Sequence, residues 1–190
     1  MTVYFTIGLF ITFCCTATPG LLSAAEMATS TTVATPGLPK FAQMGFLIGK
    51  WSCQYRSSRR PTPWKATVTY QLSPRRHWLT ETSINFPSPW APWQRVITSN
   101  ITYDGSSGRW VDVSLVDNGS YSVSTSSGWQ TNAILWQDMN LSHSGDLAKS
   151  NSYRVTRISD NELTESWSFL SSARKVVKIS GTCKKVAFGS

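Results

Sequence analysis

Two charged side chains interrupt strand-like runs that are otherwise apolar along one face. Arg95 lies in the run 93–103 and Glu165 in the run 162–169, and alternate residues of a strand share a face. Because a buried charge needs a partner, both residues could anchor a ligand in an apolar cavity. The alternative is that they pair with each other or lie at a wet end of the fold. The candidate ligand contacts on these two faces are Arg95, Glu165, Trp93, Tyr103 and Trp167.

No arrangement of residues is typical of an enzyme. The chain has no Ser-His-Asp or Cys-His nucleophile motif, no glycine-rich phosphate loop and no paired-carboxylate motif. His77 and Glu81 share one face of a strand-like run, but the opposite face of that run is more apolar. We therefore expect both side chains to face solvent. We expect no catalytic residues, and an enzyme ranks third among the interpretations of this sequence.

Residues 1–25 are typical of an export signal. The segment 3–17 is mostly apolar and uncharged, and it is shorter than a typical membrane-spanning helix. Small residues at 23–25 precede a cleavage point at Glu26. No Lys or Arg precedes the apolar run, so a retained membrane anchor stays open. We expect three parts: a signal peptide (1–25), a flexible linker (26–38) and one folded domain (39–190).

Signal cleavage would leave two cysteines, Cys53 and Cys183, in the mature chain. In an exported protein two cysteines most simply form one disulfide. Two free thiols or half of a metal site are the alternatives. No CxxC or HxxxH spacing is present to complete a zinc shell, so we expect no metal site.

About ten strand-like runs follow residue 50, separated by turn residues. The run 64–72 alternates apolar and polar residues throughout, and Asp117-Asn-Gly119 is a strong hairpin signal. Only the segment 40–48 is typical of a helix, and it is short. Without helices long enough for βαβ units, the chain predicts an antiparallel meander, folded as a sandwich or as a barrel.

The cysteines predict how the sheet closes. In an antiparallel pair the residue numbers of partners have a constant sum, so setting Cys53 opposite Cys183 sets Trp51 opposite Lys185. Both pairs then share one face, with the lysine stem over the indole. Joining the first strand to the last removes both sheet edges. We therefore predict an all-β fold, an antiparallel up-and-down barrel of about ten strands with a short N-terminal helix.

The segment Gly49-Lys50-Trp51, at the start of the first strand, resembles the Gly-x-Trp signature of lipocalins and related calycin barrels. The resemblance implies that Trp51 plugs one barrel end and that a basic residue near the last strand, here Lys185, packs over it. A second lipocalin signature, Thr-Asp-Tyr, is not evident. The wider pattern resembles uncharacterised exported bacterial proteins with a lipocalin-like barrel. The pieces that carry it are 49–53, 101–104, 109–111, 127–129 and 181–185.

The resemblance also bears on cofactors. Heme-binding barrels of related shape use a histidine ligand, so His143 or His77 is a candidate heme ligand. A lone histidine is a minimal signal. Apart from that candidate we expect no cofactor.

The chain is basic, with 18 Lys and Arg against 10 Asp and Glu and a formal net charge of +8. That balance suits an anionic surface, or it simply maintains solubility. The densest basic pairs, 59–60 and 75–76, fall in successive turns, which lie at opposite ends of a meander. They therefore form no single patch, and we expect no nucleic-acid partner. Trp90 and Trp93 flank a proline-rich loop that is either a ligand-contacting rim or a cover over a barrel end.

These observations favour a binding protein. We predict an exported monomer, periplasmic or extracellular, that holds a small apolar or amphipathic ligand inside the barrel, with Trp90 among the ligand contacts. The alternative is an envelope-associated protein whose basic, Trp-bearing surface contacts an acidic polymer or a membrane.

Overall fold

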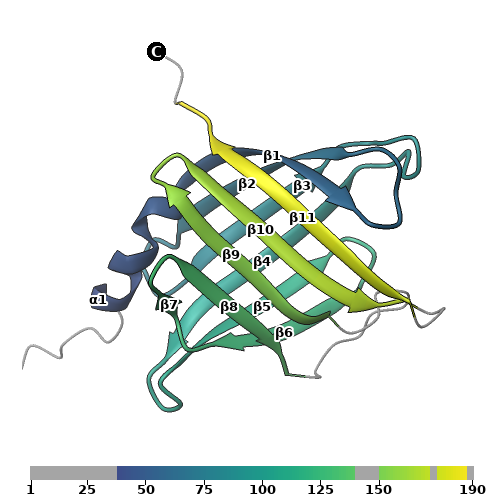
Figure 1. Cartoon of the computed structure of the whole chain (residues 1–190). Helices are drawn as coiled ribbons and strands as arrows, with labels where there is room; N and C mark the ends of the chain where they lie inside the picture. The colour runs from purple at the N-terminus through teal and green to yellow at the C-terminus, as the bar shows by residue number, and fades with distance from the viewer. Residues whose placement is uncertain (1–37, 140–149, 172–174, 188–190) are drawn as a thin grey trace, which may run out of the picture. The chain divides into compact units, whose positions relative to one another are not determined.

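The computed structural model describes residues 38–139, 150–171 and 175–187, which form an antiparallel β-barrel (Figure 1). The predicted signal peptide and nearly all of the predicted linker lie outside the described residues. A short helix and a 3-10 turn precede the strands. Their bounds are α1 Leu38–Phe41, η1 Ala42–Leu47, β1 Gly49–Ser57, β2 Trp64–Leu72, β3 Leu79–Asn85, β4 Arg95–Asp104, β5 Arg109–Val116, β6 Tyr121–Ser126, β7 Trp129–Gln130, β8 Ala133–Asp138, β9 Ser150–Ser159, β10 Glu162–Leu170 and β11 Val176–Lys185.

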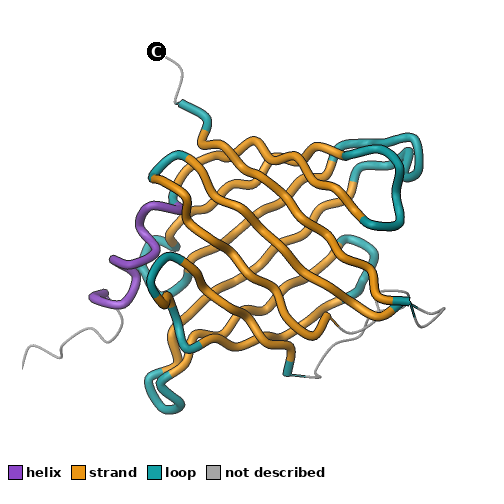
Figure 2. Tube along the Cα trace, viewed as in Figure 1, coloured by secondary structure: helices purple, strands orange, loops and turns teal. Residues whose placement is uncertain are grey.

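Ten strands form the closed wall of the barrel (Figure 2). Consecutive strands pair antiparallel from β1 to β6 and from β8 to β11, and β1 pairs with β11. A short contact between β6 and β8, Ser124 with Asp138 and Thr125 with Gln137, closes the remaining gap. The two-residue strand β7 pairs only with β8, in a hairpin, and is not part of the closed wall. The predicted all-β barrel of about ten strands is confirmed.

The first and last strands pair in the predicted register. Cys53 lies opposite Cys183 and Trp51 opposite Lys185. The two cysteines form a disulfide that links positions 130 residues apart. The closure of the barrel is therefore both hydrogen-bonded and covalent.

One end of the barrel, where β1 begins, is filled by side chains. Trp51 is fully buried there, and its Nε1 donates a hydrogen bond to the Leu47 carbonyl at 2.7 Å. Lys185 Nζ donates to the Phe46 carbonyl at 2.6 Å and lies 5.2 Å from the centre of the Trp51 ring. These contacts tie η1 to β1 and β11, and the end they seal is called the closed end below.

Helix α1 and the turn η1 also pack against tryptophans of β5 and β7. Phe41 meets the buried Trp110 of β5 edge-on, with ring centres 5.1 Å apart. Phe46 meets Trp129 in the same way at 5.1 Å. Edge-to-face aromatic pairs of this kind add to the apolar burial at the closed end. Neither α1 nor η1, the helical elements of the described part of the chain, is long and apolar enough to cross a membrane.

Candidate functional site

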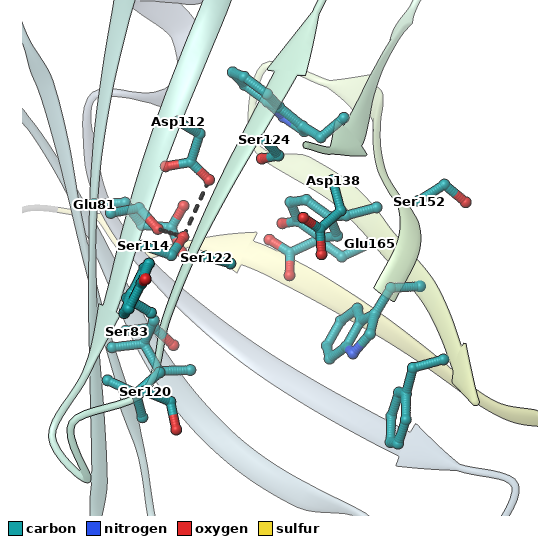
Figure 3. Close-up of a pocket in the computed structure, with 18 of the residues that line it drawn as sticks. Glu81, Ser83, Asp112, Ser114, Ser120, Ser122, Ser124, Asp138, Ser152 and Glu165 are labelled. Carbon is teal, nitrogen blue, oxygen red and sulfur yellow. Dashed lines mark hydrogen bonds between the residues drawn. The ribbon is translucent and has the colours of Figure 1, made fainter. Parts of the chain in front are cut away.

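A cavity of about 290 Å³ occupies the other half of the barrel (Figure 3). Its lining runs from the middle of the strands to the ends opposite the closed end, including the ends of β3, β5 and β10. Tyr121, at the start of β6, belongs to the lining and is itself partly exposed. The aromatic part of the lining is Tyr55, Trp64, Tyr121, Trp136, Tyr153, Trp167 and Phe169.

Inward-facing serines make much of the remaining wall polar. Because alternate residues of a strand share a face, β6 presents Ser122 and Ser124 to the interior together with Ser120 just before it. The wall of the cavity therefore offers hydroxyl groups beside aromatic rings. The other lining serines are Ser83, Ser99, Ser114 and Ser152.

Four carboxyl groups line the cavity, one each from β3, β5, β8 and β10. These are Glu81, Asp112, Asp138 and Glu165. Figure 3 shows Glu81 and Asp112 beside Ser114, with Asp138 and Glu165 across the cavity from them. Among the described residues that line the cavity there is no Lys, Arg or His.

Glu165 is the most enclosed of these carboxyls, with 5% of its surface exposed. The Tyr55 hydroxyl donates a hydrogen bond to its Oε2 at 2.8 Å. Burial raises the pKa of Glu165 above its ordinary value, and hydrogen bonds from Tyr55 and Tyr153 partly offset that rise. Burial also raises the pKa of both tyrosines, so their hydroxyls stay protonated and donate.

Glu81 points into the barrel, so the expectation that it faces solvent is wrong. It lies opposite Tyr70 of β2 and Ser99 of β4, and it lines the cavity. Burial raises its pKa to about 8, helped by the negative charges of Glu165 and Asp112, while a hydrogen bond from Tyr70 lowers it. The prediction failed because the interior is itself polar here, so the more polar face of β3 is the inward one.

Asp112 is held by a chain of hydroxyls. Ser114 Oγ donates to Asp112 Oδ2 at 3.1 Å, and Ser99 Oγ lies 2.6 Å from Ser114 Oγ. Burial raises the pKa of Asp112 to about 7, and the serine hydrogen bonds counteract part of that rise. Asp112 Oδ1 is buried without a hydrogen-bond partner in the described part of the chain.

The structure separates the predicted ligand contacts into two groups. Glu165 and Trp167 line the cavity. Arg95 does not line it; this residue is the first of β4 and lies opposite Asn85 at the edge of the wall. The hydrogen-bond partner of Glu165 is Tyr55 and not Arg95. Tyr103 lies near the closed end, 5.5 Å from the Trp110 ring and under the ammonium of Lys40.

The two tryptophans of the proline-rich loop also differ. Trp90 packs edge-on against Trp64, a cavity-lining residue, with ring centres 5.2 Å apart. The Arg60 guanidinium lies 4.7 Å above the Trp90 ring. The loop is therefore folded against the rim of the cavity through Trp90, whereas Trp93 is 61% exposed.

Of the two candidate heme ligands, His77 is described, and it does not line the cavity. His77 is exposed in the turn between β2 and β3, at the closed end and away from the cavity, and His143 lies outside the described residues. In the described ranges no group of three or more His, Cys, Asp or Glu side chains is arranged to hold a metal ion.

No protein-family model matches the chain, and no curated protein sequence matches it. Among solved structures, a protein of unknown function from the DUF3598 family of Nostoc punctiforme is similar, with a TM-score of 0.42 and 16% identity over 75% of this chain and 49% of that chain. This chain thus spans about half the length of the Nostoc protein. An S-type phycobiliprotein lyase from Guillardia theta gives a TM-score of 0.38 and 8% identity over 77% of this chain and 90% of that one. Both likenesses are too distant to indicate a function.

Proposed function

We propose that this protein binds a small amphipathic molecule inside the barrel and that it does so as an exported protein. The observation that carries the proposal is the cavity of about 290 Å³, whose wall combines aromatic rings with hydroxyl and carboxyl groups. Small-molecule sites usually start at about 300 Å³ and pair an apolar lining with a few polar groups. The volume therefore suits a ligand at the small end of that range.

The rest of the barrel supports an internal site. The closed end is filled by Trp51 and its neighbours, so the ligand enters from the opposite end, where Tyr121 and the loop carrying Trp90 lie. The disulfide between Cys53 and Cys183 agrees with export, because disulfides persist in oxidising compartments. Three tryptophans in the wall, Trp64, Trp136 and Trp167, would report ligand binding through their fluorescence.

The rival function, contact with an acidic polymer or a membrane through a basic surface, has less support. The pairs 59–60 and 75–76 follow β1 and β2, which run in opposite directions, so the two pairs lie at opposite ends of the barrel. What favours the rival is the exposure of Trp93 and Phe86 in one loop. Binding to anionic vesicles that weakens with added salt and is lost in Trp93→Ala would support it.

Native mass spectrometry of the protein purified from its own host tests the internal site. We expect a small molecule to accompany the wild-type chain. Ser122→Trp places an indole in the cavity and should remove that molecule, whereas Ser52→Trp, at an exposed position on β1, should retain it. A molecule retained by Ser122→Trp as well as by the wild type would argue against a site in the cavity.

A further inference from the structure

The charge of the cavity is opposite to that of the chain. Four of the 10 acidic residues line the cavity, and none of the Lys and Arg residues in the described ranges does so. Buried carboxyls are normally paired with a basic group. Here the three whose contacts are described above, Glu81, Asp112 and Glu165, meet hydroxyl groups instead. The cavity therefore gathers acidic groups with no basic partner among its described lining.

We propose that the cavity selects ligands that carry a positively charged amine on a small apolar body, an inference that rests on the proposed internal binding site. The charged group lies among the carboxyls of Glu81, Asp112 and Glu165. The apolar body lies against the aromatic part of the wall, toward Trp167 and Phe169 near the end of β10.

Two features of the wall fit an ammonium group. Asp112 Oδ1 is a buried acceptor that no described residue uses, and an ammonium has three donors and no acceptor. The rings of Trp136, Trp167 and Tyr153 also line the cavity, and aromatic faces attract cations. At pH 8, where the wall carboxyls begin to ionise, a ligand carboxylate would instead meet like charges and leave Asp112 Oδ1 unsatisfied.

The protonation of the carboxyls makes such binding depend on pH. Burial without a counter-ion raises the pKa of Glu81 to about 8 and that of Asp112 to about 7, so near neutral pH the empty cavity holds protons on them. A bound cation favours the ionised carboxyls, so protons leave as the ligand binds. Amine binding should therefore tighten as pH rises from about 6 to 8. The titratable groups that face one another here are Tyr55, Tyr70, Glu81, Asp112, Asp138, Tyr153 and Glu165.

Three probes with one shared body test the charge preference: phenylbutylamine, phenylbutanol and phenylbutyrate. We expect titration calorimetry at pH 8 to give an affinity for the amine at least about tenfold above that for the alcohol, with the carboxylate weakest. Equal affinities for amine and alcohol, or a preference for the carboxylate, would overturn the charge selection and leave the internal site intact. Failure of all three probes to bind would overturn both proposals for ligands of this size.

Substitutions then place the effect on named carboxyls. Glu81→Gln and Asp112→Asn should each weaken amine binding by about tenfold and change alcohol binding much less, because the alcohol carries no charge. Glu162→Gln is the matched control, because Glu162 lies next to the inward-facing Leu163 and so on the outer face of β10.

In the wild type, amine affinity should rise about tenfold from pH 6 to pH 8 with measurable proton release, and alcohol affinity should not change. Amine affinity that is independent of pH and of both substitutions contradicts the proposal. Two substitutions at separate strands keep the test valid if one variant fails to fold.

Discussion

The ring of Tyr55 on β1 packs directly over Gly181 on β11, and the Tyr55 hydroxyl thereby reaches Glu165 on β10. Gly181 is the register partner of Tyr55 on β1 and of Glu165 on β10. A Cβ atom at position 181 would lie 2.2 Å from Cδ1 and 2.3 Å from Cε1 of the tyrosine ring. The missing side chain on β11 therefore allows a hydrogen bond of 2.8 Å to span two strands of the barrel.

Gly181→Ala should destabilise the barrel strongly. The added methyl group must displace the Tyr55 ring, which is buried between Trp64 and Trp167, so the core has little room to relax. Overpacking of this kind typically costs 1–3 kcal/mol, and we expect about 3 kcal/mol here because the hydrogen bond to Glu165 is lost as well. Urea unfolding followed by tryptophan fluorescence measures the change.

Gly105→Ala is the matched control for that substitution. Nothing lies within 4 Å of a Cβ atom at position 105, and its backbone is not in the left-handed region. Its free energy of unfolding should stay unchanged or rise by up to about 1 kcal/mol, because alanine restricts the unfolded chain. Equal destabilisation in both variants would mean that the Tyr55 contact is not the cause.

Loss of the disulfide should lower stability without changing the fold. The bond between Cys53 and Cys183 spans 130 residues. In the chain-entropy model a loop of that length contributes up to about 5 kcal/mol, and measured values are often smaller. The double variant Cys53→Ala with Cys183→Ala should therefore unfold at lower urea and keep its far-ultraviolet circular dichroism. A urea midpoint equal to that of the oxidised wild type would contradict this expectation.

The pairing of the first and last strands could be predicted because one residue pair determines an antiparallel register. Once Cys53 is set opposite Cys183, every other partner follows, including Trp51 with Lys185. No helix or long insertion lies within these two strands to shift the count. The fold class followed equally directly, from the alternation within runs and the turn residues between them.

The cavity could not be predicted in the same way, and Glu81 shows why. Hydropathy alone assigns the apolar face of a strand to the interior, and that rule fails in a strand that lines a polar cavity. The signal that could have corrected it is the register with β4, where Glu81 lies opposite Ser99 and Leu79 opposite Ile101. That register depends on how the long loop between β3 and β4 folds, which residue types do not determine.

Arg95 and Glu165 show a second limit. Alternation correctly places Glu165 on the inward face of β10, but it says nothing of the height of a residue along the barrel axis. Glu165 is in the middle of β10, whereas Arg95 is the first residue of β4 and lies where the wall ends. A sequence predicts the ends of strands only to within a few residues. It therefore could not show that Glu165 contacts the cavity and that Arg95 does not.

Lys185→Met should weaken the closed end. The substitution keeps an unbranched apolar stem over Trp51 but removes the hydrogen bond from Nζ to the Phe46 carbonyl and the cation above the ring. We expect a loss of about 1–3 kcal/mol in the free energy of unfolding, measured with urea. Lys184→Met is the control, because Lys184 is exposed on the outer face of β11. Equal losses in the two variants would argue against the role given to Lys185.

The inward carboxyls should make the empty barrel less stable as pH rises. Glu81 has a pKa of about 8 in the folded chain against an ordinary value of 4.5, and Asp112 about 7 against 3.8. Between those values the folded chain binds more protons than the unfolded chain, so the free energy of unfolding falls as pH rises from about 4 to 8. Urea unfolding at pH 5 and pH 8 should show a fall on the order of a few kcal/mol. Glu81→Gln has no proton to lose at this position and should reduce that difference, while Glu162→Gln should keep it. A Glu81→Gln variant with the full wild-type fall would show that Glu81 is not the group responsible.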